Sequence, residues 1–406
     1  MTHTIGHHGH HPHGTFVKRM SMRPTALECG VKPAGLLIVT NVDWFFLSHR
    51  VPIARAAIAA GYDVHVAAAD TGRADEVEAL GATFHPLPFT RSGAQPLHEL
   101  RAIMALGALY RRIKPAILHH VSIKPSLYGT IASVGVPRAI VINALSGFGF
   151  TVEGGSRVFR ALTLAAYRLA FALRRPYVLV QNDDHAHMIE RMRLTAPGRV
   201  VTIYGSGVDT GLFRPRDDPS ERSRPVVMMT GRMLRDKGIE EFMAAARTVQ
   251  AKQPHVRFVM VGPSDDDNPT AVSREDLEAA CASSNVEWWG HRDDIPDVLR
   301  QADVYVAPSH HEGLPKALLE AAATALPLVA TDIAGHRPVV TPANGILVPR
   351  RDPTRLAKAI LELLDLPHET RLRMGRQARE HSLAFSVDTV VRQTLDLYHR
   401  VLGARG

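Results

Sequence analysis

Short apolar runs alternate along the chain with longer segments in which apolar residues recur every three or four positions. The first unit of this kind has an apolar run at 35–40, a helix-period segment at 48–60 and a second apolar run at 62–68. This order predicts a strand, a crossover helix and a parallel strand. Because Ser48 can cap the helix, we expect residues 41–47 to form a loop at the carboxyl end of the first strand, where open parallel sheets bind ligands.

The same alternation continues to the end of the chain. Further strands are expected at 115–120, 138–142, 177–180, 200–204, 226–230, 257–262, 286–289, 304–307, 328–331 and 345–348. A polar stretch with three prolines at 214–225 separates two sets of strands, so we predict an α/β protein of two doubly wound, Rossmann-like domains. The first domain would span 34–213 and the second 225–385. A flexible His-rich tail would occupy 1–33, and a terminal helix at 386–406 would cross back to the first domain.

Composition narrows the class of protein. With 406 residues, 45% of them hydrophobic and 22% charged, the chain fits two globular domains with a cleft between them. Lys and Arg (48) exceed Asp and Glu (40), and the net charge of +8 suits an anionic ligand, an anionic membrane surface or nucleic acid. Because the basic residues are scattered and no binding motif with interleaved aromatic residues occurs, we expect no nucleic-acid partner.

The cysteines and the N-terminus bear on the compartment. Neither Cys29 nor Cys281 lies in a CxxC pair, which argues against a disulfide framework or a zinc site and favours a reducing cytosol. The N-terminus lacks the apolar stretch of a secretory signal, and no apolar run of about 18 residues predicts a spanning helix. Six histidines among the first fourteen residues could bind a metal, but a flexible tail is the simpler interpretation.

Two segments of the second domain carry candidate chemistry. The first, 230–238, follows a predicted strand and precedes a helix, so its amides and the side chains of Arg232 and Lys237 can converge on a diphosphate. The second runs from Glu312, on the loop before a helix with a proline in its first turn, to Glu320 inside that helix. Glu312 would reach a sugar, and Glu320 would accept the hydroxyls of a ribose. The alternative is solvated charge on an ordinary turn and helix.

Together these segments resemble family 4 of the retaining glycosyltransferases, which have the GT-B fold of two Rossmann-like domains with an interdomain cleft. The resemblance covers nearly the whole chain from about residue 35 and rests on residues 205–215, 231–238 and 308–316 and on the two glutamates separated by seven residues. The donor-binding residues that it implies are Gly231, Arg232, Lys237, Arg292, Glu312, Gly313, Leu314 and Glu320. Arg232, Lys237 and Glu312 would also be catalytic.

In the first domain, residues 41–50, 119–125 and 143–149 resemble a branch that acts on polyprenyl-diphosphate saccharides and often uses UDP-N-acetylhexosamines. The acceptor-binding residues that this implies are Asn41, Trp44, His49, Lys124 and Gly147. His120 is a further catalytic candidate, although the sequence leaves open whether His119 or His120 faces the cleft, and a histidine at a strand end is as often structural. The family's Gly-rich first loop is missing, which suggests that the bulky segment here is adapted to its acceptor.

The resemblance implies transfer of a hexose or N-acetylhexosamine from a nucleotide sugar, with UDP as the expected nucleotide, to a lipid-linked or glycan acceptor in cell-surface polysaccharide or glycan synthesis. No carboxylate is an obvious nucleophile, so the residues themselves do not indicate the stereochemistry. Retention of configuration is expected from the resemblance to the family alone. We expect no metal and no other cofactor, since two cations and a helix N-terminus can stabilise the departing diphosphate and the acidic run 265–267 lies in a polar loop.

Three other classes of protein are alternatives to a glycosyltransferase. A sugar-nucleotide epimerase of the same fold would share the donor site but would need no acceptor cleft. A catalytically inactive sugar-binding subunit is the second alternative. A nicotinamide-dependent dehydrogenase is disfavoured, because the first strand of neither domain is followed by GxGxxG.

A segment at 156–175 is helix-forming, apolar, rich in arginine and free of acids. Such a helix can lie in a membrane interface, with Arg157, Arg160 and Arg168 on anionic headgroups. A core-packed helix with solvated arginines is the alternative. Because residues 44–47 are apolar and would lie at the mouth of the same domain, we expect a cytoplasmic protein that is peripheral on the cytoplasmic face of the inner membrane.

Overall fold

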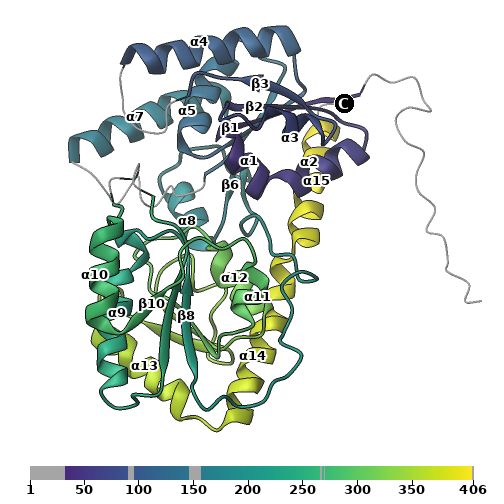
Figure 1. The fold of residues 1–406 in the computed structure, drawn as a ribbon. Coiled ribbons are helices and arrows are strands. Elements are labelled where there is room, and N and C mark those ends of the chain that lie inside the picture. Colours follow the sequence, from purple (N-terminus) through teal and green to yellow (C-terminus); the bar gives the residue numbers. More distant parts are fainter. Residues whose placement is uncertain (1–32, 90–95, 146–156, 266–267, 269, 405–406) are drawn as a thin grey trace, which may run out of the picture.

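The computed structural model describes residues 33–89, 96–145, 157–265, 268 and 270–404. Within these residues the chain forms two α/β domains, each around one parallel sheet (Figure 1). The fold class predicted from the sequence is therefore confirmed. Gly147, the segment 1–32 and the side chains of Arg157 and Arg160 lie outside what the structure describes.

The first domain holds a seven-stranded sheet in the order β3-β2-β1-β4-β5-β6-β7. Its strands are β1 (Gly35–Val42), β2 (Asp63–Ala69), β3 (Thr83–Pro86), β4 (Ile117–Val121), β5 (Ile140–Ala144), β6 (Tyr177–Val180) and β7 (Val200–Thr202). Its helices are α1 (Asp43–His49), α2 (Val51–Ala59), α3 (Ala74–Glu78), α4 (Pro96–Ile113), α5 (Ile123–Ala132), η2 (Ser133–Gly135), α7 (Arg157–Arg174) and α8 (Asp183–Arg191). Alternate residues of β1 point to opposite faces, so Ile38 packs in the core that includes α2, whereas Leu37 packs in the core that includes α4.

The second domain holds a six-stranded sheet in the order β10-β9-β8-β11-β12-β13. Its strands are β8 (Val226–Thr230), β9 (Arg257–Val261), β10 (Val286–Trp288), β11 (Val304–Ala307), β12 (Leu328–Thr331) and β13 (Gly345–Val348). Its helices are η3 (Arg235–Lys237), α9 (Ile239–Gln250), α10 (Arg274–Ser284), α11 (Ile295–Leu299), α12 (Lys316–Ala323), α13 (Pro353–Asp365), α14 (His368–Ser382) and η4 (Leu383–Phe385). Buried β11 lies beside β8, so the loops after both strands open at the same edge of the sheet.

The C-terminal helix α15 (Val387–Gly403) runs from the second domain to the first (Figure 1). Ser386 caps its first turn by accepting a hydrogen bond from the amide of Thr389. Leu397, Tyr398 and Val401 are buried in the first domain's core, where α15 packs on α2. The helix therefore belongs to the first domain by its contacts, although it follows the second in sequence.

Residues 41–47 do not form the loop that the sequence analysis expected. β1 continues through Asn41 to Val42, and α1 begins directly at Asp43. The fully buried carboxylate of Asp43 accepts hydrogen bonds from the amides of Trp44 and Thr71, both at 2.6 Å, and this fixes the start of the helix. Ser48 therefore caps nothing: its hydroxyl donates back to the carbonyl of Trp44 at 2.9 Å.

The aromatic segment 44–47 is not a membrane-facing loop either. Phe46 is fully buried in the first domain's core, and Leu47 packs against the same core. Phe45 stacks on His49 with ring centroids 4.3 Å apart. The apolar surface of Phe46 and Leu47 is therefore used inside the domain, whereas Trp44 and Phe45 line the pocket between the domains, and a role of the segment at a membrane stays a prediction. No helix in the described part of the chain is long and apolar enough to cross a bilayer.

Candidate active site

A pocket of about 1220 Å³ lies where the carboxyl ends of the two sheets face each other. Its first-domain wall comes from the segment after β1, the start of α5 and the start of α8, and its second-domain wall comes from the loops after β8, β11 and β12. Drug-sized ligands fill pockets of roughly 300–1,000 Å³, so this one has room for more than one small substrate. Most of the predicted site residues lie in it.

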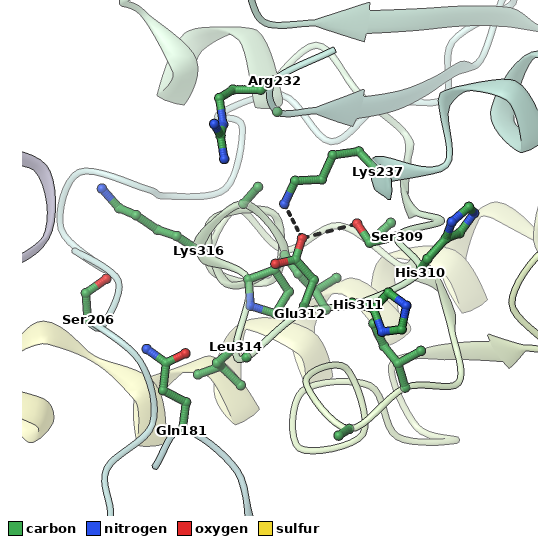
Figure 2. A pocket seen from close by; sticks show the side chains of 18 of the residues that line it. Gln181, Ser206, Arg232, Lys237, Ser309, His310, His311, Glu312, Leu314 and Lys316 are labelled. Carbon is green, nitrogen blue, oxygen red and sulfur yellow. Dashed lines mark hydrogen bonds and ion pairs between the residues drawn. The ribbon is translucent and has the colours of Figure 1, made fainter. Parts of the chain in front are cut away.

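Lys237 and Glu312 form an ion pair at the centre of the second-domain wall (Figure 2). Ser309 donates a hydrogen bond to the same carboxylate at 3.2 Å. Burial alone would raise the pKa of Glu312, but the Lys237 ammonium and the Ser309 hydroxyl hold it below its usual value. Glu312 is thus an ionised carboxylate that is fixed in place at the pocket wall.

A glycine makes this pair possible. Gly238, which ends η3 next to Lys237, has φ of 75°, and a Cβ there would lie 2.2 Å from the carbonyl oxygen of Pro308. The loop after β8 can therefore lie directly against the loop after β11 only with glycine at this position. This close approach brings Lys237 to Glu312.

Arg232 lies across the pocket from Glu312 and points into it (Figure 2). Its guanidinium forms an ion pair with Asp265 at 2.7 Å, and its side chain is 45% exposed. Gly231, beside it, lines the pocket with φ of 149°. An exposed pair of this kind is weak in water, so Arg232 is available to an incoming anion.

The start of α12 contributes backbone groups and one further cation. Pro315 is the N-cap, so no side chain caps the first amides of the helix. Lys316 points into the pocket from the first turn (Figure 2). Gly313 and Leu314 line the wall before it, and the Gly313 carbonyl accepts a hydrogen bond from Asn182 of the first domain at 2.7 Å. Free amides and cations at a helix start suit a phosphate group.

Glu320 lies one turn further into α12, where it is buried and does not itself line the pocket. Burial raises its pKa to about 7, and the ammonium of Lys316, 3.6 Å away, reduces that effect. The structure therefore places the predicted ribose-binding residue behind Lys316.

The first-domain wall contains four of the predicted acceptor-binding residues. Asn41, Trp44, His49 and Lys124 all line the pocket, and Lys124 forms an ion pair with Glu99 at 2.8 Å. Burial first, and then the charges of Arg50, Lys316 and Arg232, lower the pKa of His49 to about 4. Its imidazole is therefore neutral at physiological pH and can hydrogen-bond a hydroxyl.

Ser122, at the entrance to α5, is strained. Its φ of 81° and ψ of 172° lie in a region that favours glycine. The residue lines the pocket directly after β4. Strain of this kind at the wall of a pocket is typical of functional sites.

Besides Glu320, two further predicted site residues do not line the pocket. His120 is fully buried: its Nε2 lies 2.9 Å from the Tyr110 hydroxyl and its Nδ1 lies 2.7 Å from the Asn143 side-chain oxygen. Both nitrogens have partners inside the domain, which favours the structural interpretation of His120 over a catalytic role. Arg292 is paired with Asp294 on the surface before α11 and does not line the pocket.

Other pocket residues were missed because their partners are distant in sequence. His310 pairs with Glu241 of α9 at 2.8 Å, and Arg337 pairs with Asp184 of the first domain at 2.7 Å. Arg50, which also lines the pocket, is the last residue of the segment 41–50 but was not among the predicted acceptor-binding residues. No local motif predicts these contacts, although Arg50 could have been found from its position beside His49.

Two facing parallel sheets with a cationic cleft at their carboxyl edges are the architecture of the GT-B fold. The comparison with known families agrees with this architecture. The sequence model of the "Glycosyl transferase 4-like" family matches residues 36–182, and that of the "Glycosyl transferases group 1" family matches residues 224–366. Each match lies within one domain, so the chain belongs to these glycosyltransferases, and the resemblance to family 4 is confirmed.

Individual relatives are similar over most of the chain. A Campylobacter jejuni N,N'-diacetylbacillosaminyl-diphospho-undecaprenol alpha-1,3-N-acetylgalactosaminyltransferase is 25% identical over 380 residues, which cover 88% of this chain and 98% of that protein. An Escherichia coli UDP-Gal:alpha-D-GlcNAc-diphosphoundecaprenol alpha-1,3-galactosyltransferase is 27% identical over 66% of this chain and 71% of its own length. The structure of Anabaena HepE in complex with UDP matches with a TM-score of 0.73 at 17% identity, covering 90% of this chain and all of that one.

The Lys237–Glu312 pair should serve both stability and transfer. In Lys237→Ala the partly buried Glu312 loses its partner, so we expect the protein to be about 1–3 kcal/mol less stable to urea. Loss of a charge-assisted contact to the donor should also reduce kcat/KM by roughly 10–150-fold. The double variant Lys237→Ala/Glu312→Gln should regain most of the stability but none of the activity. Activity that returned together with stability would show that transfer needs neither charge and that the single variant fails only because Glu312 is left unpaired.

The buried Glu320 should make stability depend on pH. Its carboxyl is neutral in both states below its ordinary pKa of 4.5, but above the folded pKa of about 7 the folded protein contains a buried carboxylate. The wild type should therefore lose about 3 kcal/mol relative to Glu320→Gln as the pH rises from 4.5 to 8, measured by urea unfolding. Glu362→Gln, an exposed change on α13, is the control. A constant difference between wild type and Glu320→Gln across this range would contradict the raised pKa.

Proposed function

We propose that the protein transfers a hexose or N-acetylhexosamine from a UDP-sugar to a polyprenyl-diphosphate-linked saccharide, with retention of configuration and without a metal ion. The product would serve the synthesis of a cell-surface polysaccharide. The observation that carries this proposal is the two-sided pocket. Cations and free amides that suit a diphosphate lie on one wall, and groups that can bind hydroxyls lie on the other. The names of the two bacterial relatives, with diphospho-undecaprenol acceptors and one UDP-Gal donor, support the substrate class.

The donor wall would stabilise the departure of the nucleoside diphosphate. Negative charge grows on the leaving phosphate as the sugar becomes oxocarbenium-like, and catalysis requires groups that bind this charge more strongly in the transition state. Arg232, Lys237 and Lys316 lie around the same part of the pocket, next to the free amides of α12 (Figure 2). Such groups can supply the stabilisation that a divalent cation supplies in other enzymes.

The acceptor wall favours transfer over epimerisation. An epimerase needs room for one nucleotide sugar, whereas here Trp44, His49 and Ser122 form a second side opposite the donor wall. The acceptor hydroxyl would attack from the face that the diphosphate leaves, and its proton would pass to the leaving phosphate. Neutral His49 would orient the hydroxyl by a hydrogen bond rather than take its proton, because its pKa is about 4.

Transfer in the presence of a chelator tests this proposal. The protein without its first 20 residues should bind UDP in a thermal-shift assay and transfer sugar from one of a panel of UDP-sugars to a short-chain prenyl diphosphate saccharide in excess EDTA. Nuclear magnetic resonance should show the donor's anomeric configuration in the product. Inversion would contradict retention, and activity that required added Mg²⁺ or Mn²⁺ would contradict metal independence. Transfer would be contradicted if every donor of the panel gave free sugar and no acceptor product.

A membrane surface on the first domain would deliver the lipid-linked acceptor. α4 and α7 both pack on α5 and lie at the outer end of the first domain (Figure 1). Leu162, Leu169 and Leu173 of α7 are each 63–66% exposed, and α4 exposes Leu97 and Met104. Exposed leucines together with the exposed Arg168 suit an anionic lipid interface. The proposed location is therefore the cytoplasmic face of the inner membrane.

Vesicle binding tests the membrane surface. The wild type should sediment with phosphatidylglycerol vesicles at low salt, and Leu162→Asn/Leu169→Asn/Leu173→Asn should bind at least tenfold more weakly, because each buried leucine contributes about 1.5 kcal/mol or more. Leu212→Asn/Leu383→Asn removes two exposed leucines from other parts of the chain and should bind as the wild type does. Equal binding of the two variants would remove α7 from the interface.

A further inference from the structure

Arg50 is a buried cation at the wall of the pocket. It lies between α1 and α2, is only 5% exposed, and lines the pocket beside His49. Its Nε has no hydrogen-bond partner, and no carboxylate among the described residues pairs with its guanidinium. Burial lowers its pKa to about 10, so the group remains charged at physiological pH. A buried charge without a partner is unfavourable unless a ligand compensates it.

The interior around Arg50 does not compensate the charge. Arg50 and His119 line a small cavity of about 20 Å³, and Arg50 and Gln181 line both this cavity and the large pocket. Nδ1 of His119 lies 2.5 Å from the Tyr398 hydroxyl, and its Nε2 has no partner among the described residues. Burial and the charge of Arg50 both hold the pKa of His119 well below its usual value. A water in this cavity could complete hydrogen bonds but could not balance the charge.

The excess of cationic side chains in the pocket can also balance the charge of a second anion. Eight Lys and Arg residues line it against three acids, and each of those acids is already paired: Glu312 with Lys237, and both Asp184 and Asp332 with Arg337. A nucleotide sugar would bring its diphosphate to the second-domain wall. Arg50 is on the opposite wall, with His49 next to it in the chain.

We propose that Arg50 binds the phosphate nearest to the sugar of an acceptor whose sugar is a phosphate ester. This inference rests on the proposed function, since it assigns the donor diphosphate to the other wall. Arg50 would then select glycosyl phosphates and diphosphates over neutral glycosides, because the planar guanidinium binds phosphate through two parallel hydrogen bonds. His49 would contact the sugar between this phosphate and the donor.

A second anion should therefore bind when the donor site is already filled. With UDP at saturation, isothermal titration should show that the wild type binds pyrophosphate and that Arg50→Met binds it at least tenfold more weakly. Arg50→Lys should recover part of the affinity. Arg55→Met, an exposed change on α2, should bind pyrophosphate and transfer sugar as the wild type does. Absence of pyrophosphate binding to the UDP-bound wild type, or equal binding by Arg50→Met, would overturn the proposal.

Stability separates a binding role from a structural one. If Arg50 is kept for a ligand, Arg50→Met removes an uncompensated charge, and the melting temperature of the ligand-free protein should rise by about 2 °C or more. A lower melting temperature would show that Arg50 supports the fold and would overturn the proposal.

Two further measurements identify the source of the phosphate and keep the test valid if UDP does not bind. N-acetylglucosamine 1-phosphate should compete with pyrophosphate better than inorganic phosphate does. Equal competition would mean a site for free phosphate and would overturn the acceptor assignment. If UDP itself does not bind, the proposed donor is wrong. The Arg50→Met comparison is then made with pyrophosphate alone, because Arg232 and Lys237 are the same in both proteins.

Discussion

Two parallel sheets have to present their carboxyl edges to one cleft, and the rest of this structure depends on that constraint. The loops and helix starts that can bind ligands gather at this edge of each sheet. Neither domain has the site alone, because Asn182 of the first domain bonds to Gly313 of the second and Arg337 of the second pairs with Asp184 of the first. The connections between the domains must therefore hold the two edges face to face.

The chain meets this requirement by passing between the two domains twice, with the two crossings side by side. Val208, after the first sheet, pairs with Ser386, before the last helix, in a parallel bridge. Gly207 has φ of 78°, and a Cβ there would lie 2.7 Å from the Cα of Val387, so the two crossings can touch only with glycine. Tyr398 then anchors α15 in the first domain through His119. Adjacent crossings of this kind form the position about which a closing motion of the domains would pivot.

Charge is distributed in the cleft so that its cations face the space between the walls. Glu312 neutralises Lys237 until a donor arrives, and Arg337 holds both Asp184 and Asp332. Burial and three nearby cations keep His49 neutral, so the wall opposite the donor offers a hydrogen bond without a further charge. The arrangement favours anionic ligands, because each carboxylate that lines the pocket is already paired with a cation.

The sequence by itself determined the fold class and the family, and it named several residues of the second-domain wall of the pocket. Aliphatic runs buried on both faces mark the strands of parallel sheets, and Arg232, Lys237, Glu312 and Gly313 lie on segments that directly follow two of these strands. That these residues bind a donor stays a prediction. The edge strand β3 was missed because it is short, contains a proline and a histidine, and pairs with only one neighbour.

Tertiary structure alone decided what depends on contacts between distant segments. Asp43 starts α1 where the apolar pattern predicted a loop, because Thr71 supplies its hydrogen bonds from the next connection. His119 and His120 are adjacent in sequence, yet the sheet turns them to opposite faces: one meets Tyr398 and the other meets Tyr110. Neither side chain lines the large pocket, where a catalytic histidine was expected. Whether Arg50 is paired or alone in the interior is likewise a property of packing, because burial and charge compensation are set by side chains that the local sequence does not contain.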